Sequence, residues 1–271
     1  MPVSILPDRA VIELAGEDRI TFLQGLVSND VRQAGPGRAV FAAFLTPQGR
    51  WLADFFIHAT PDALLLDCEA GHVPLLVQRL SRLRLRARIR LSETGRAVLV
   101  GWGDAPPIPG AVPDPRLAEA GWRAIGAPGD APDLSEAYDL HRLALGLPDG
   151  SRDLRAEQTL LLEAGYDELH AISWDKGCYL GQELTARTRY RGLIKRRLMP
   201  VRVEGPLPAP DTAVLLDGAE VGEMRSGRSG LGIAMLRLSA LAASRPLACG
   251  QALLHPAPAP WMRLPALSDA G

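Results

Sequence analysis

The sequence holds few cysteines, almost no lysine and no long apolar run. Its three cysteines, Cys68, Cys178 and Cys249, are far apart and odd in number. They form neither a disulfide framework nor a CxxC metal motif, so we expect a reducing, cytosolic compartment. No apolar segment approaches the length of a membrane-spanning helix, and residues 1–9 lack the pattern of a signal peptide. These absences predict a cytoplasmic protein that contacts no membrane.

Balanced charge argues against a second class of partner. The chain has 30 basic and 31 acidic residues, a formal net charge of −1, so we expect no general attraction to nucleic acid. Only two of the basic residues are lysine, Lys176 and Lys195. An ammonium group differs physically from a guanidinium group, which indicates a functional reason for lysine at position 176. Chance explains Lys195, inside a basic run, equally well.

The order of hydrophobic patterns predicts an α+β fold with a separate β-rich end. Strand-like runs cover 40–45 and 51–59, and helical spacing recurs around them. From Met199 onward, short β-like segments are separated by glycine and proline, which is typical of a small β-barrel. We therefore predict an α+β region of two interleaved subdomains over 1–198 and a β-barrel-like domain over 199–271. We expect a monomer.

A regular alternation of arginine with apolar residues covers 82–91. The arginines are Arg82, Arg84, Arg86, Arg88 and Arg90. This pattern predicts a strand with one buried face and one cationic face. The cationic face is either a solvated surface or a site for phosphate or carboxylate groups, and the sequence leaves both possibilities open.

The segment KGCYLGQE, residues 176–183, is the strongest candidate site. Its cysteine lies between a lysine and the expected start of a helix over 182–190, and both neighbours favour a thiolate. The glycines permit backbone conformations that bring the main chain close to a ligand. The site residues assigned from this segment are Lys176, Gly177, Cys178, Tyr179, Gly181, Gln182 and Glu183. We expect Cys68 and Cys249 to be structural.

Three segments in this order resemble the YgfZ-type folate-binding proteins. They are RITFLQG with SNDV over 19–31, TPQGRWLAD over 46–54, and the KGCYLGQE segment continued to Gly192. That family is related to the glycine-cleavage T-protein, an aminomethyltransferase, and includes mitochondrial iron–sulfur assembly factors of the same type. The resemblance extends from about residue 10 to about residue 255.

The resemblance implies a three-domain cloverleaf around a central folate channel, with tetrahydrofolate or a one-carbon-substituted form bound. It implies a role in assembling or repairing iron–sulfur clusters in client enzymes, with iron–sulfur assembly or client proteins as partners. The catalytic residues that we predict are Cys178, Lys176 and Asp54. The implied folate contacts are Asp54, Arg142, Glu163, Gly177, Tyr179, Gly181, Gln182, Glu183, Arg187 and Arg191. A carboxylate suits the N–H groups of a reduced pterin, and arginine suits the glutamate tail.

Several alternatives stay open at this stage. If Asp54 does not contact folate, it is an ordinary solvent-facing strand residue. If Arg142 and Glu163 do not contact folate, they form a surface or interdomain ion pair. Two functions are alternatives to iron–sulfur cluster assembly. The protein is then either a folate-dependent aminomethyl or one-carbon transferase acting on a small amine, or a noncatalytic scaffold in which folate only stabilises the domain arrangement. The sequence lacks the Gly-Tyr-Thr-Gly-Glu-type stretch of the aminomethyltransferases, which argues against transfer. A cysteine protease or acyltransferase requires a histidine base, for which His170 and His141 are the nearest candidates.

Overall fold

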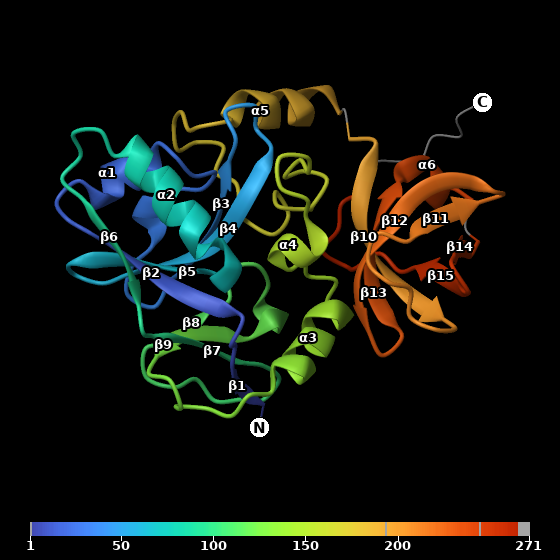
Figure 1. The fold of residues 1–271 in the computed structure, drawn as a ribbon, viewed down its shortest axis with the longest axis horizontal. Coiled ribbons are helices and arrows are strands. Elements are labelled where there is room, and N and C mark those ends of the chain that lie inside the picture. The colour runs from blue at the N-terminus through green and yellow to red at the C-terminus, as the bar shows by residue number, and fades with distance from the viewer. Residues whose placement is uncertain (1, 193, 244, 265–271) are drawn as a thin grey trace.

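Two antiparallel sheets and a closed barrel make up the β structure of the chain (Figure 1). The computed structural model describes residues 2–192, 194–243 and 245–264. In Figure 1 the five-stranded sheet lies at upper left, the four-stranded sheet below it and the barrel at right, with short helices between them. The predicted α+β class with a C-terminal β-barrel is confirmed.

The five-stranded sheet is buried on both faces because its central strands carry almost no polar residue. Its order is β3-β4-β5-β2-β6. One face packs against the helices that follow β2 and β5, where Leu23, Leu76 and Leu80 are buried. The opposite face, with Phe41 and Phe56, packs against residues 161–172 and the barrel. The strands are β2 (Arg9–Ala15), β3 (Val40–Leu45), β4 (Trp51–Ala59), β5 (Ala63–Glu69) and β6 (Arg90–Thr94).

The four-stranded sheet takes its first strand from the N-terminus. Its order is β1-β7-β9-β8, and β1 pairs with β7 whereas β2 pairs with β5 and β6. The chain therefore begins in one sheet, crosses to the other and then returns. The strands are β1 (Val3–Ile5), β7 (Ala97–Gly101), β8 (Val112–Pro113) and β9 (Trp122–Gly126). The domain division at residue 198 stays a prediction.

The barrel closes in the order β10-β13-β12-β11-β14-β15. Met199, Val214, Leu236 and Leu254 are buried in its interior. The barrel strands are β10 (Arg196–Glu204), β11 (Ala213–Leu216), β12 (Ala219–Arg228), β13 (Leu231–Arg237), β14 (Leu247–Cys249) and β15 (Ala252–Pro256). Residues 265–271 of the predicted second domain lie outside the described residues.

The helices are short. None in the described ranges has the length and apolar character needed to cross a membrane. The α-helices are α1 (Arg19–Gln24), α2 (Val73–Leu83), α3 (Ser135–Ala144), α4 (Gly150–Asp153), α5 (Gln182–Arg191) and α6 (Leu238–Leu241). The 3-10 turns are η1 (Val31–Gln33), η2 (Ala70–His72) and η3 (Ala118–Ala120). The start of a helix at Gln182, predicted from the sequence, is confirmed.

The predicted strand over 82–91 is wrong. The helix α2 continues to Leu83, a loop follows, and β6 begins only at Arg90. The period of two was misleading because Val73, Leu76 and Leu80 had already set a helical period that buries one face of α2. Arg82 lies on the exposed end of α2, three further arginines lie in the loop, and only Arg90 belongs to a strand, as the first residue of β6.

Buried ion pairs join the two sheets. Asp67 of β5 is fully buried and accepts hydrogen bonds from Arg9 Nε at 2.7 Å and from Arg123 Nη2 at 2.6 Å. Burial disfavours the charge of Asp67, yet the adjacent guanidinium groups of Arg123 and Arg9 lower the pKa of its carboxyl below the usual value. The Arg123 guanidinium also lies 3.8 Å from the centre of the Phe56 ring. The link between sheets is thus both ionic and aromatic.

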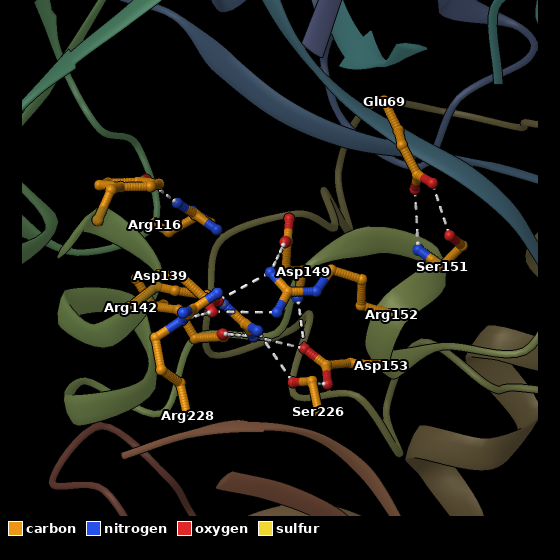
Figure 2. A network of polar contacts seen from close by, with 12 residues as sticks. Glu69, Arg116, Asp139, Arg142, Asp149, Ser151, Arg152, Asp153, Ser226 and Arg228 are labelled. Atoms are coloured by element: carbon orange, nitrogen blue, oxygen red, sulfur yellow. Dashed lines mark hydrogen bonds and ion pairs between the residues drawn. The ribbon is translucent and has the colours of Figure 1, made fainter. Parts of the chain in front are cut away.

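A second group of ion pairs joins α3 and α4 to the barrel (Figure 2). Arg142 donates to Asp139 at 2.8 Å, to Asp153 at 2.6 Å and to the hydroxyl of Ser226 at 2.9 Å. Arg228 of β12 donates to Asp139 at 2.8 Å. Since Ser226 and Arg228 come from the barrel, these contacts fix the barrel against the helices at the centre of the molecule.

We expect Asp67→Asn to lower the free energy of unfolding by about 3–5 kcal/mol, because it removes the counter-charge of buried Arg9 and leaves Arg123 only Asp114, at 3.6 Å. Urea unfolding of the intact protein measures this loss. Asp217→Asn is the matched control, since the ion pair of Asp217 with Arg245 is exposed and its removal should cost less than about 1 kcal/mol. Equal losses in the two variants would contradict the role of Asp67 as the buried link.

Candidate functional site

The 176–183 segment is docked on the C-terminal end of α1. The ammonium group of Lys176 donates to the carbonyls of Gln24 at 2.6 Å and Val27 at 2.5 Å. The backbone N–H of Leu180 donates to the carbonyl of Gly25 at 3.1 Å. The last carbonyls of a helix have no partner inside the helix. Lys176 and Leu180 therefore satisfy orphan acceptors, and two of the three sequence motifs meet here.

This geometry gives a physical reason for lysine at position 176. The site is buried, and two carbonyls of one short turn converge on a single nitrogen. A compact ammonium group can donate in several directions from one atom, whereas the planar fork of arginine cannot. Burial lowers the pKa of Lys176 to about 8, so the group is still mainly protonated at neutral pH. Its nitrogen also lies 5.1 Å from the centre of the Tyr179 ring.

Two glycines bring the third motif into the same place. A Cβ on Gly181 would lie 2.6 Å from the carbonyl oxygen of Thr46, and a Cβ on Gly49 would lie 2.6 Å from the carbonyl oxygen of Gly181. Both residues have positive φ, +82° and +74°. Glycine is therefore required at both positions for conformation and for space. The turn at 46–50 and the start of α5 pack backbone against backbone.

Cys178 lies in the loop that these contacts hold. Its side chain is exposed and forms no disulfide. It comes four residues before α5, whose N-cap position is occupied by Gly181. No group of three or more metal-binding side chains occurs within the described part of the chain. A metal centre at Cys178 would therefore need ligands from outside this molecule.

The other two cysteines differ sharply from Cys178. Cys68 is buried in β5, where burial raises the pKa of its thiol to about 12. Cys249 is buried in the barrel, and burial raises its pKa as well. Thiols that stay protonated are poor nucleophiles and poor ligands, so exposure singles out Cys178.

Neither candidate histidine base contacts Cys178. The ring of His141 lies against the carbonyl of Glu119, 3.1 Å from Nε2. The carbonyl of His170 accepts a hydrogen bond from Asn29 at 2.7 Å. Among the described residues no hydrogen bond joins Cys178 to either ring. The arrangement is not that of a cysteine protease.

Asp54 is buried in β4, only 5% exposed, which excludes the solvent-facing alternative. One of its oxygens, Oδ2, accepts from Trp51 Nε1 at 2.9 Å and from the hydroxyl of Tyr166 at 2.7 Å. No donor to the other oxygen is found in the part of the chain described. Burial raises the pKa of Asp54 above its usual value. The carboxyl group is thus oriented by two fixed donors and retains one oxygen for another partner.

A cavity of about 550 Å³ is lined by the start of β3 and by residues 172–175, the segment that leads into Lys176. Phe41 lines it and stacks on Phe56 at 4.8 Å between ring centres, and it lies 5.2 Å from the ring of Tyr166. Tyr166 in turn donates to Asp54. Other residues that line the cavity are Asn29, Arg38, His170, Trp174 and Asp175. The aromatic walls and polar groups suit a flat, polar organic ligand.

The remaining residues predicted from the sequence lie in other surroundings. Arg142 belongs to the network that joins α3 and α4 to the barrel, which matches the alternative of an interdomain ion pair. Glu163 pairs with Arg196 of β10 at 3.3 Å, so it also contacts the barrel. Glu183 and Arg187 form an exposed ion pair one helical turn apart, 2.6 Å between Nη2 and Oε1. Arg191 is exposed at the last position of α5.

Sequence reasoning missed Trp51 and Tyr166, the two donors to Asp54, and Trp174 in the cavity wall. Trp51 sits three residues from Asp54 on one strand, a spacing that gives little signal. Tyr166 is 112 residues away in sequence. Trp174 is two residues before Lys176, and its indole is covered by the guanidinium of Arg189 at 4.1 Å. An aromatic residue beside the KGCY segment was the one available clue.

Comparisons with known proteins agree on one family. Residues 195–264 match the family model described as CAF17, C-terminal beta-barrel domain. The chain is 32% identical to the mitochondrial iron–sulfur cluster assembly factor IBA57 of Mus musculus, covering 86% of this chain and 76% of the relative. It is 33% identical to the Homo sapiens protein, covering 85% and 76%. The Mycosarcoma maydis homologue is 34% identical over 72% of this chain, which spans only 56% of that relative.

A solved structure extends the likeness to the fold. The glycine cleavage system aminomethyltransferase T from Bartonella henselae superposes with a TM-score of 0.75, over 96% of this chain and 86% of the other, at 15% sequence identity. The predicted T-protein type of fold is confirmed. The expectation of a cytoplasmic protein is wrong, because each of the three relatives above is described as mitochondrial.

We expect Gly181→Ala to destabilise the protein more than Gly177→Ala. Both glycines have positive φ, so both variants carry a backbone cost of about 1–2 kcal/mol. Only at Gly181 would the new methyl group collide with the turn at 46–50, since nothing lies within 4 Å of a Cβ at Gly177. Urea unfolding of the two variants measures the difference. Equal destabilisation would show that the two motifs do not pack as described.

Proposed function

The chain belongs to the family of IBA57 iron–sulfur cluster assembly factors, and from this membership we propose that it assists assembly or repair of iron–sulfur clusters in client proteins through the thiol of Cys178. The observation that carries the proposal is the presentation of one exposed thiol on a loop held from both sides. Lys176 and Leu180 fasten the loop to α1, and Gly181 fastens it to the turn at 46–50. Such fastening keeps a reactive atom at a fixed place without burying it.

The chemistry assigned to Cys178 is transient ligation. Loss of the thiol proton to solvent gives a thiolate, which donates an electron pair to an iron atom of a cluster held by a partner. Release of the cluster to a client breaks that bond and returns the thiolate. A single thiolate is one of the four protein ligands that a cluster commonly has, so the partner supplies the others. The cluster is thus a substrate in this proposal.

We place the protein with the tetrahydrofolate-binding, YgfZ-type members of this fold. Two features fit that ligand: the residues that line the cavity, and Asp54, which does not line it but is linked through Tyr166 to Phe41 of its wall. Asp54 has one oxygen without a donor, suited to the N–H groups of a reduced pterin, and Phe41 and Trp174 offer aromatic surfaces for its ring. Arg38 at the cavity edge suits a carboxylate of the glutamate tail. Bound tetrahydrofolate would supply nitrogen atoms that carry one-carbon units.

The residues of the chain have distinct tasks in this proposal. Trp51 and Tyr166 hold the Asp54 carboxyl group in one orientation by donating to the same oxygen. Lys176 positions the loop of Cys178 and does not contact substrate. Arg142 and Glu163 hold the barrel against the rest of the molecule. The other residues assigned to folate, Gly177, Tyr179, Gly181, Gln182, Glu183, Arg187 and Arg191, act by shaping the loop and α5.

Aminomethyl transfer to a small amine is the second candidate. The buried carboxyl group of Asp54 favours it, because burial raises the pKa of that group above its usual value and so makes it a better acceptor of a proton from a bound amine. In that case folate and Asp54 carry the reaction, and Cys178 has no part in it. The two candidates therefore differ in their dependence on Cys178.

We expect Cys178→Ser to abolish support of iron–sulfur enzymes while leaving the fold and folate binding unchanged, because a serine hydroxyl is a poor ligand for iron. The measurement is the activity of iron–sulfur enzymes in cells that carry the variant in place of the native protein. Cys249→Ser is the control, since that cysteine is buried and should not matter for function. Full support by Cys178→Ser would contradict the proposal, and turnover of an amine donor by that variant would favour the transferase.

We expect tetrahydrofolate to bind with an affinity that Asp54→Asn lowers about 10- to 100-fold, because the amide would turn an N–H donor toward the pterin N–H groups. Calorimetric titration of the reduced protein measures this, with Asp62→Asn, an exposed turn residue, as control. The affinity of the native protein should fall as the pH is lowered through the raised pKa of Asp54, since protonation removes the acceptor. Affinity that rises at lower pH would contradict a carboxylate contact.

A further inference from the structure

The loop after α2 contains a leucine in an unfavourable position. Leu85 has φ +48° and follows the C-cap residue Arg84. Helices commonly end with a left-handed residue at this position, and it is usually glycine because a side chain strains the backbone there. The side chain of Leu85 is also 88% exposed, so burial within this chain does not offset the strain. A bulky, strained and exposed apolar residue points to a role outside the monomer.

Arginines surround Leu85. Arg82, Arg84, Arg86, Arg88 and Arg90 are all exposed. Arg88 pairs with Glu17 at 2.8 Å, whereas the other four make no ion pair with any described residue. The chain has a formal net charge of −1, so with these five arginines set aside the rest carries −6. The segment 82–90 is therefore a cationic patch on an otherwise acidic molecule.

We propose that the segment 82–90 is a docking surface for a protein partner that presents an acidic segment beside a shallow apolar pocket. The unpaired arginines match the acidic segment, and Leu85 fills the pocket. A partner of limited size fits better than an extended polyanion. A membrane or a nucleic acid would bring the acidic remainder of this molecule near further negative charge, and the patch has no aromatic residue of the kind that anchors a protein to a bilayer surface.

The surface is independent of the Cys178 loop in its chemistry. It contains no cysteine, histidine or carboxylate of its own, so it recognises a partner without taking part in ligation. Arginine is one of the residues that supply most of the energy in protein interfaces. Electrostatic attraction would also increase the rate of encounter at low salt.

The test uses a fluorescein-labelled, glutamate-rich peptide with interspersed leucines and the intact protein, with binding followed by fluorescence anisotropy. We expect the double variant Arg84→Glu with Arg86→Glu to weaken binding at least about tenfold. The control is Arg202→Glu with Arg237→Glu, two exposed arginines of the barrel, which should bind as the native protein does. Unchanged affinity in the Arg84 and Arg86 variant would overturn the proposal.

Leu85→Gly provides a second test, because stability and peptide binding should change in opposite directions. A residue with only a structural role would not show this combination. Because glycine relieves the strain at φ +48°, we expect the melting temperature to rise by about 2–4 °C, while peptide binding weakens several-fold. Binding that is unaffected by Leu85→Gly would overturn the role of the leucine. Vesicles of phosphatidylcholine and phosphatidylserine, or a DNA duplex, bound more tightly than the peptide through the same arginines would overturn the choice of partner.

Discussion

Charge compensation inside the protein is the constraint on which the rest of the structure depends. Arg9 and Arg123 share the carboxylate of Asp67 at the junction of the two sheets, and Arg142 joins α3 and α4 to the barrel. Pairs of this kind add little net stability over apolar packing, but breaking one is costly because it leaves a buried charge. Their main effect is therefore on geometry. The two sheets, the helices α3 and α4 and the barrel must be oriented so that these buried charges are paired.

That fixed arrangement is what allows a short loop to present a thiol. The loop of Cys178 touches α1 through Lys176 and Leu180 and touches the turn at 46–50 through Gly181. All of these contacts involve backbone atoms on one side, so they depend on the position of main chain more than on the identity of neighbouring side chains. The buried carboxyl group of Asp54 is held by Trp51 of β4 and by Tyr166, which lies in a turn outside the sheet. The exposed thiol and the buried carboxyl group are thus placed by one framework.

Much of the framework was predictable from local patterns. Apolar runs gave β3 and β4, the Gly and Pro spacing after Met199 indicated the barrel, and the start of α5 at Gln182 was placed correctly. The prediction of a strand over 82–91 was wrong because arginine and apolar residues can alternate along an exposed helix end and loop as well as along a strand. The alternation alone does not distinguish the two. The fate of that segment was decided by α2, in which Val73, Leu76 and Leu80 set a helical period and which continues to Leu83.

The sequence by itself singled out three residues as candidates: an isolated cysteine in KGCYLGQE, a lysine in a chain that otherwise uses arginine, and an aspartate in an apolar strand. Only the tertiary structure decided what those residues do. Lys176 became an anchor because the end of α1, about 150 residues earlier, offers two unpaired carbonyls. Asp54 became an oriented acceptor because Tyr166 arrives from 112 residues away. Contacts over such separations leave no local pattern, since they arise from how modules pack and not from how neighbouring residues alternate.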